Sequence, residues 1–238
     1  MEYAPSISRI ALLLADPKRS AMIWALIDGS ARASEELATL AGLTPSSASA
    51  HLARLAAGGL LKLEPRGRKR FFKLATPQVG TAVEALASVC SGCFDGLDEQ
   101  GVAGLPVTSH GMRKARLCHD HLGGELAVEL FQRFLDAGWV EQHDQRVEVT
   151  HKGAQQLARH GIYIQALASP LERAACPCSD WSNARPHIGG PLGASLLTLF
   201  LQSGWLRTSD ESRLLHLSQA GLREIGKIAQ EVERPELV

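Results

Sequence analysis

The second half of the 238-residue chain contains an internal repeat, which limits it to folds built from two similar units. Residues 121–140 align without a gap with residues 187–206, and nine of the twenty aligned pairs are identical. Both copies begin with His-x-Gly-Gly and end with Gly-Trp. A repeated segment of this length is expected to fold as a repeated supersecondary unit. Each copy is predicted to form a helix, a hairpin after the Gly-Trp pair, and a second helix capped by Thr150 or Ser218.

The first third of the chain predicts two short helices joined by a turn. Residues 34–40 carry acidic residues in their first turn, and Ser34 is expected to cap that helix. Ala41-Gly42-Leu43 forms the predicted turn. Thr44 is expected to cap the next helix, in which Pro45 occupies the first position and which ends before Gly58. Two helices joined by a short turn that contains glycine are typical of a helix-turn-helix.

A basic hairpin is predicted directly after the second of these helices. Residues 60–63 and 70–74 read as strands, with residues 65–68 as the bend. The whole chain has 25 basic and 25 acidic residues, but residues 1–76 have eleven basic and six acidic ones, a net charge of +5. A local basic cluster in a neutral chain indicates a face that meets an anion, and here it predicts the wing of a winged helix. The cluster comprises Lys62, Arg66, Arg68, Lys69, Arg70 and Lys73, opposed by Glu64.

The first 95 or so residues resemble the winged-helix repressors of the ArsR family. The resemblance rests on Ser-Glu-Glu-Leu-Ala at 34–38, on the run Ser-Ala-His-Leu-Ala-Arg-Leu at 49–55, and on Gly-Leu-Leu at 59–61 followed by the Gly-Arg wing. It implies a homodimer that binds a palindromic double-stranded DNA operator and is released by an effector. The better-known metal sensors of the family carry a cysteine box on the helix before the recognition helix. Residues 34–40 contain no cysteine, so that particular metal site is absent here.

The predicted DNA contacts lie on the second helix and the wing. Small or short polar residues at the start of a recognition helix allow its backbone to enter the major groove. Basic side chains neutralise phosphates. His51 is expected to contact either a base or a phosphate, and the alternative for the serines is that they merely face water. The expected contacts are Ser46, Ser47, Ser49, Ala50 and His51 in the groove, and Arg54, Arg66, Arg68, Lys69 and Arg70 on the backbone.

A Cys-x-Asp motif precedes each His-x-Gly-Gly of the repeat, and it marks the candidate effector or metal site. Cys118 and His121 are predicted to share a helix face, and the paired glycines would allow close approach of the backbone. Thiolate and imidazole donors suit a thiophilic metal ion. The candidate residues are Cys118, Asp120, His121, Cys178, Asp180 and His187.

Three other interpretations of this region stay open at the level of sequence. A redox switch could use Cys176 with Cys178, or Cys90 with Cys93. An organic effector could bind in a pocket between the repeats. The cysteines could also be small buried side chains with only a structural role. The identity of the cofactor or effector is therefore unknown from the sequence, and the chain could alternatively be a small metal- or thiol-dependent enzyme that uses the Cys, His and Asp residues of 118–187.

The predicted fold class is mainly α with small β-hairpins: a winged helix-turn-helix domain followed by a duplicated half-winged-helix region. The expected boundaries are 1–95 for DNA binding and dimerisation, 96–106 for a linker, and 107–238 for an effector-sensing region with repeats at about 118–160 and 178–230. No apolar run approaches the ~18 residues that span a bilayer. The first residues do not show basic residues followed by an apolar stretch, which is the order found in a secretion signal. The five cysteines have no regular spacing, which argues against a disulfide scaffold. A cytoplasmic regulator without membrane contact is expected, and no enzymatic activity.

Overall fold

The computed structural model describes residues 3–93, 110–144, 146–167, 173–182, 185–209 and 212–230. The chain forms two compact units. Residues 1–109 together with 210–213 make the first unit, and residues 110–209 with 214–238 make the second. The linker predicted at 96–106 lies outside the described residues. None of the described helices is long and apolar enough to cross a membrane.

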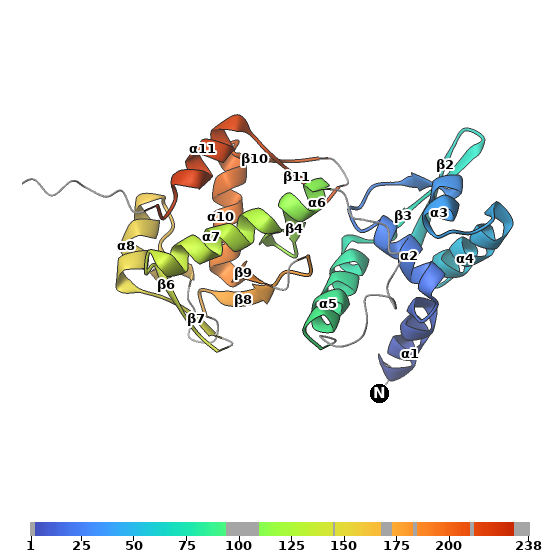
Figure 1. Ribbon diagram of the computed structural model, residues 1–238, viewed down its shortest axis with the longest axis horizontal. Coiled ribbons are helices and arrows are strands. Elements are labelled where there is room, and N and C mark those ends of the chain that lie inside the picture. The colour runs from blue at the N-terminus through green and yellow to red at the C-terminus, as the bar shows by residue number, and fades with distance from the viewer. Residues whose placement is uncertain are drawn as a thin grey trace, which may run out of the picture. The chain divides into compact units, whose positions relative to one another are not determined.

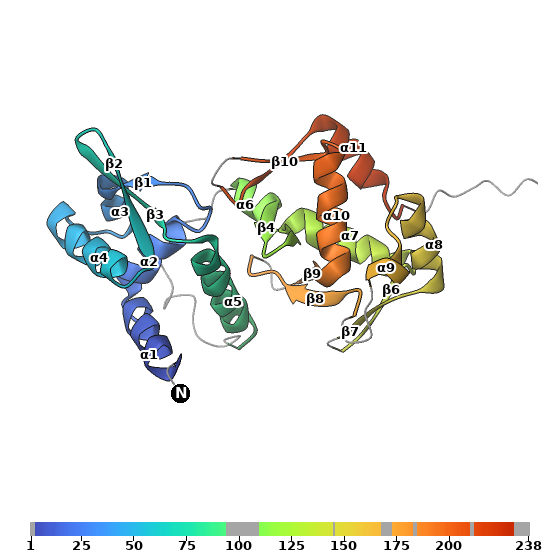
Figure 2. The ribbon, with the colours of Figure 1, turned by 180° about the vertical axis from the view of Figure 1, so that it is seen from behind.

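The first unit is a winged helix-turn-helix, as the sequence predicts (Figure 1). Strands β1, β3 and β2 form a three-stranded antiparallel sheet in that order. Figure 2 shows β1 beside β3 and the β2–β3 hairpin extending past helix α3. The elements are α1 (Tyr3–Leu14), α2 (Pro17–Ala25), β1 (Arg32–Ala33), α3 (Ser34–Leu40), α4 (Pro45–Ala57), β2 (Leu61–Arg66), β3 (Lys69–Leu74) and α5 (Pro77–Cys93).

The caps of the two central helices differ from each other. The Thr44 hydroxyl accepts a hydrogen bond from the Ser47 backbone N–H, which confirms Thr44 as the N-cap of α4 with Pro45 in its first turn. The prediction for Ser34 is wrong. Ala33 is the N-cap of α3 and Ser34 is already helical, because residues 32–33 are extended and pair with β3. The strand pairing therefore fixes where α3 begins, and no side-chain cap is needed.

The core of the first unit lies between the two helices of the motif and the sheet. Leu37 from α3, Leu52 and Leu55 from α4, and Phe72 from β3 are all buried. The end of α4 also packs closely against α1. Gly58 lies so near the Leu13 side chain that a Cβ at Gly58 would be only 2.2 Å from Leu13 Cδ1. These contacts fix the orientation of α4 within the unit.

The second unit consists of two copies of one motif, a hairpin, a helix, a second hairpin and a second helix (Figure 1). The sequence predicts the last three parts of each copy, and the structure adds the first hairpin. A short helix, α6 (His110–Lys114), precedes the first copy, and α9 (Ile164–Leu167) follows it. The first copy contains β4 (Arg116–Cys118), β5 (His121–Gly123), α7 (Glu125–Asp136), β6 (Val140–His143), β7 (Arg146–Val149) and α8 (His151–Arg159). The second contains β8 (Cys176–Ser179), β9 (Pro186–Gly189), α10 (Gly190–Gln202), β10 (Leu206–Thr208), β11 (Leu215–Leu217) and α11 (Gln219–Lys227).

The two copies repeat the same close contact after the Gly-Trp pair. A Cβ at Gly153 would lie 1.9 Å from the Trp139 carbonyl oxygen, and one at Gly221 would lie 2.1 Å from that of Trp205. Only glycine fits at these positions, because α8 and α11 begin directly against the backbone of the preceding tryptophan. As predicted, these two helices are capped by the hydroxyls of Thr150 and Ser218, each of which accepts the N–H of the glycine three residues later.

The prediction of a helix that carries Cys118 and His121 is wrong. These residues end β4 and begin β5, and they face each other in the register of the hairpin. His119 and Asp120 form the two-residue turn, with His119 at a φ of 52°. In a hairpin of this length residues three apart are opposite each other, so the two side chains still meet, although on a different element.

Candidate DNA interface and metal site

Helix α4 divides into a polar exposed face and an apolar buried face. Ser46, Ser47 and Ala50 near its N-terminus are exposed, Ser49 is half-buried, and Arg54 is exposed one turn further on. Ala48, Leu52 and Leu55 are buried against the core. The face left open toward solvent is therefore the one that the sequence assigns to the major groove.

His51 has a neighbour that the sequence does not predict. Its Nδ1 lies 3.8 Å from the Asp16 carboxylate, and its side chain is 20% exposed. Asp16 caps α2 by accepting the backbone N–H groups of Lys18 and Arg19. Burial raises the pKa of Asp16, but these hydrogen bonds and the charges of Arg19 and His51 outweigh it, so the pKa is lowered. His51 thus lies against the start of α2.

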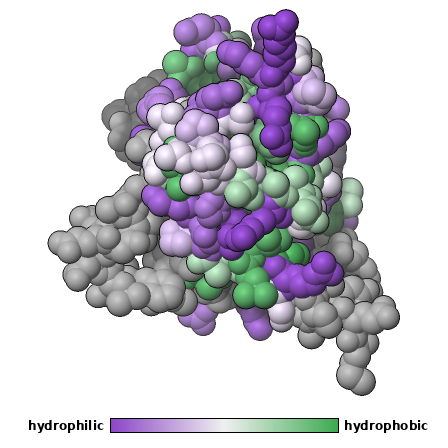
Figure 3. Space-filling model, turned by 90° about the vertical axis from the view of Figure 1, so that its right-hand side faces the viewer, coloured by the Kyte–Doolittle hydropathy of each residue, from purple (hydrophilic) through white to green (hydrophobic). Residues whose placement is uncertain are grey.

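The β2–β3 hairpin carries its basic side chains in two groups. Arg66 and Lys73 both pair with Glu64, at 3.1 and 2.6 Å. Arg68, Lys69 and Arg70, at and beside the turn, are exposed. Figure 3 shows hydrophilic side chains projecting at the top of the face that it presents. The tip therefore directs three cationic side chains to solvent, and Arg66 is also exposed although it pairs with Glu64.

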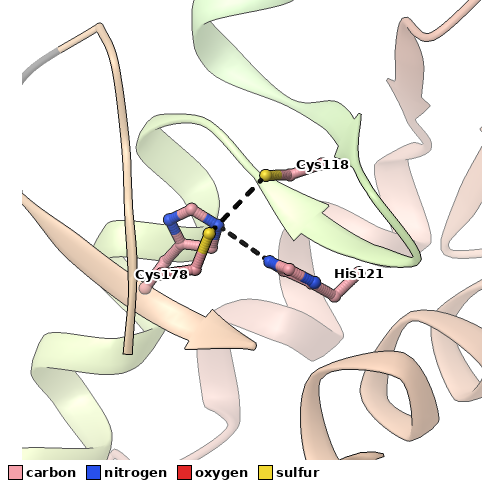
Figure 4. Close-up of side chains that lie close together, drawn as sticks. Cys118, His121 and Cys178 are labelled. Atoms are coloured by element: carbon pink, nitrogen blue, oxygen red, sulfur yellow. Dashed lines mark hydrogen bonds between the residues drawn. The ribbon is translucent and has the colours of Figure 1, made fainter. Parts of the chain in front are cut away.

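The second unit brings two cysteines and two histidines together, one of each from each repeat. Cys118, His121, Cys178 and His187 offer ligand atoms that all lie within 4.8 Å of one another. Cys118 Sγ is 3.9 Å from Cys178 Sγ, and the Nε2 atoms of His121 and His187 are 3.1 Å apart. Figure 4 shows Cys118, His121 and Cys178 pointing toward one point from different strands. All four are among the six residues that the sequence marks as a candidate effector or metal site.

The hairpins bring these donors together because glycines let them approach closely. Cys178 faces His187 in the β8–β9 register, as Cys118 faces His121 in β4–β5. A Cβ at Gly189 would lie 3.3 Å from the His121 ring, and one at Gly193 would lie 3.0 Å from the His121 Cβ. Cys118 and both histidines are buried, and Cys178 is half-buried.

Hydrogen bonds within the cluster shift the protonation of its thiols. The hydrogen bond with Cys178, together with burial, raises the pKa of the Cys118 thiol to about 11. The same hydrogen bond lowers the pKa of Cys178. Burial acts to lower the pKa of His121, but hydrogen bonds to Cys118 and Asp120 outweigh it, so the pKa is raised. The two thiols share one hydrogen bond, in which either sulfur can be the donor, at an Sγ–Sγ distance of 3.9 Å.

The two aspartates of the repeated motif have different partners. Asp120 is 71% exposed on its side chain and its carboxylate lies 3.0 Å from His121 Nδ1. Asp180 is fully buried, where it pairs with Arg116 at 2.8 Å and accepts the Gly124 backbone N–H at 2.8 Å. Neither carboxylate belongs to the four-residue cluster. Asp120 contacts a candidate ligand, whereas Asp180 connects the second repeat to the first.

Arg116 is the residue of this site that sequence analysis misses. Its guanidinium is buried between Asp180 and Trp181, whose ring centroid lies 4.4 Å from Arg116 Cζ. Cys176 occupies the equivalent position of the second repeat, where it faces Gly189 as Arg116 faces Gly123. The repeat therefore gives no signal for an arginine here.

The remaining candidate cysteines lie outside the cluster. Cys176 is exposed on β8 and is a free thiol, as is its neighbour Cys178. Cys90 and Cys93 lie at the end of α5, but their side chains are outside the described part of the chain.

A pocket lies between the two repeats of the second unit, and it is lined by apolar side chains and one glycine. These are Leu122, Ala127, Leu130, Ile188, Gly193, Leu196 and Phe200.

Comparison with known proteins decides the family. A helix-turn-helix domain family matches residues 14–64. The HTH-type transcriptional regulator YdfF of Bacillus subtilis (strain 168) is 31% identical over 219 residues, which cover 91% of this chain and 94% of YdfF. The chain belongs to the HTH-type transcriptional regulators. Because the match to YdfF spans nearly all of both chains, the second unit is a shared part of these two regulators.

This HTH-type regulator also resembles solved structures over part of its length. A homodimeric winged helix-turn-helix domain from Mycobacterium bovis, described as a possible ArsR-family regulator, is 24% identical, covers 41% of this chain and 89% of its own, and has a TM-score of 0.37. The cadmium sensor CMTR of Mycobacterium tuberculosis is 35% identical, covers 33% of this chain and 81% of its own, and has a TM-score of 0.30.

Proposed function

We propose that this regulator is a homodimeric repressor that binds a palindromic operator through α4 and the tip of the β2–β3 wing. The observation that carries the proposal is the pairing of an exposed, serine-bearing helix N-terminus with an exposed cationic hairpin in one folded unit. The serines and Ala50 read base edges, and Arg54 with the wing residues Arg68, Lys69 and Arg70 contacts phosphates.

Arg66 and His51 have lesser roles in this account. Arg66 shares Glu64 with Lys73, so its charge is partly neutralised before DNA arrives. His51 lies against Asp16. We therefore assign His51 to a phosphate contact or to a structural role, and not to the recognition of a base. The specificity of binding then comes mainly from Ser46 and Ser47.

Exposed apolar side chains of the first unit support the proposal of a dimer. Leu12 of α1 and Val89 of α5 are 70% and 63% exposed, and Ile7 and Leu86 on the same two helices are more than half exposed. Exposed apolar side chains in such number on two helices indicate a protein interface. A dimer presents two recognition helices to half-sites about one helical turn apart, which is the arrangement that reads a palindrome.

The effector acts through the second unit in this proposal. Release requires that the effector bind the free and the DNA-bound conformations with different affinity. An enzymatic role for the same residues is less well supported. If the four clustered side chains held a metal, they would fill its tetrahedral shell and leave no open position for a substrate.

The experiment is selection of duplex DNA from a random library, followed by transcription from a promoter that carries the selected site. The proposal expects an inverted repeat to be enriched and transcription to fall when the regulator is added. Failure to enrich any duplex, or a rise in transcription, contradicts it.

A further inference from the structure

We propose that the second unit binds one zinc ion through the Sγ atoms of Cys118 and Cys178 and one ring nitrogen each of His121 and His187. The ion joins the two repeats, since each repeat supplies one cysteine and one histidine and neither supplies four donors. This deepens the proposed function by naming a ligand of the second unit, but its evidence is independent of DNA binding.

Two of the separations among the donors match those of tetrahedral zinc. Bond lengths of about 2.3 Å to sulfur and about 2.05 Å to nitrogen place two sulfurs about 3.8 Å apart and two nitrogens about 3.3 Å apart in a tetrahedron. The observed separations are 3.9 Å between the cysteine sulfurs and 3.1 Å between the histidine Nε2 atoms. A tetrahedral set of two thiolates and two imidazoles is typical of zinc.

Asp120 supplies an independent indication of a metal. Histidines that ligate a metal commonly donate their other ring N–H to a carboxylate, which fixes the tautomer and the orientation of the ring. The Asp120 carboxylate lies at His121 Nδ1, and this leaves Nε2 as the nitrogen that faces the cluster. Asp120 is thus a positioning residue for a ligand.

The surroundings of the cluster favour a closed site that stabilises the fold. Three of the four donors are buried, and four protein donors complete the shell of the ion. The competing arrangement of the same atoms is a Cys118–Cys178 disulfide, in which the sulfurs would approach to about 2.05 Å. The observed 3.9 Å matches the two-thiolate edge of a zinc site and not a covalent bond.

The test is zinc and cobalt binding by the full chain, purified under reducing conditions. We expect one zinc per chain by elemental analysis, and with Co²⁺ the intense visible bands of a tetrahedral site together with a thiolate charge-transfer band. Cys118→Ser and Cys178→Ser are each expected to lose the charge-transfer intensity of one thiolate and to retain far less zinc. Cys176→Ser is the matched control, because that thiol lies on the same strand but outside the cluster, and it should bind zinc as the wild type does.

The cobalt spectrum of the wild type keeps the test decisive even if a ligand variant folds poorly. Wild-type protein that takes up no zinc, gives an octahedral cobalt spectrum, or contains a Cys118–Cys178 disulfide in place of the ion overturns the inference. An equal loss of zinc in Cys176→Ser and Cys118→Ser also overturns it. None of these measurements involves DNA. A failure of the zinc proposal can therefore be distinguished from a failure of the proposed operator binding.

Discussion

Nε2 of His121 lies 3.1 Å from Nε2 of His187, although 66 residues separate them along the chain. The two histidines hold the same position in their repeats, at the start of β5 and within β9, each facing a cysteine across its hairpin. Duplication of a hairpin with two donors has therefore produced a cluster of four. The four donors follow from the repeat itself, and this is why they could be identified before the structure was known.

Replacing Asp120 with asparagine should weaken zinc binding without removing a ligand. Loss of such a carboxylate typically costs 10- to 100-fold in metal affinity, because the histidine ring loses its fixed tautomer. Competition with a chromophoric chelator measures the change. Asp136→Asn is the control, since that exposed carboxylate bonds to Gln132 in the same repeat, away from the cluster. Equal affinity in the wild type and Asp120→Asn would contradict the role given to Asp120.

Replacing Asp180 with asparagine should strongly destabilise the second unit. Removing one partner of a buried ion pair leaves the other charge uncompensated and costs about 3–5 kcal/mol of unfolding free energy. Arg116 and Asp180 are both fully buried. Denaturant unfolding in the presence of a chelator separates this effect from that of a metal. Glu224→Gln is the control: it breaks the exposed pair with Lys227 and should lower the unfolding free energy by less than about 1 kcal/mol. A similar loss of unfolding free energy in Asp180→Asn and Glu224→Gln would contradict the stabilising role given to the buried pair.

Substitutions at the start of α4 should separate folding from DNA reading. Thr44→Ala removes the helix cap and should cost about 1 kcal/mol of stability. Ser46→Ala leaves the cap in place and should leave the unfolding free energy unchanged within about 0.5 kcal/mol, while it relaxes the sequence preference of the selected DNA. Thermal unfolding and duplex selection are the two measurements. If Ser46→Ala selects the same site with the same stringency, the serine does not contact a base.

A charge on α5 should dissociate the dimer. Leu86→Glu places a carboxylate in the proposed apolar interface and is expected to shift the mass in solution from dimer to monomer, as measured by light scattering after gel filtration. Leu222→Glu on α11 is the matched control, because both leucines are 55% exposed. A dimer that survives Leu86→Glu, or that Leu222→Glu disrupts equally, would place the interface elsewhere.

The sequence predicts the fold best where local chemistry decides it. Thr44 and Ser218 are recognisable caps because a hydroxyl before a helix has one dominant use, and the structure confirms both. The element that carries Cys118 could not be settled in this way, because a spacing of three places two residues together on a helix face and equally across a two-residue hairpin turn.

Tertiary pairing accounts for the rest of what the sequence does not predict. Ser34 looks like a cap, but the pairing of residues 32–33 with β3 moves the start of α3 by one residue. Arg116 finds its partner Asp180 across 64 residues, and only the fold brings them together. The four donors of the cluster were predictable because the repeat marks all of them, whereas Arg116 has no counterpart in the second repeat.

The most direct test of the account is the salt dependence of operator binding by a wing variant. Arg68→Ala with Lys69→Ala and Arg70→Ala removes three proposed phosphate contacts per protomer, or six per dimer, so the slope of log K against log salt should become less steep by about 5. Arg146→Ala, on the hairpin of the second unit that is not proposed to touch DNA, should keep the wild-type affinity and slope. An unchanged slope in the triple variant, or an equal change in Arg146→Ala, would contradict the claim that this wing holds the DNA.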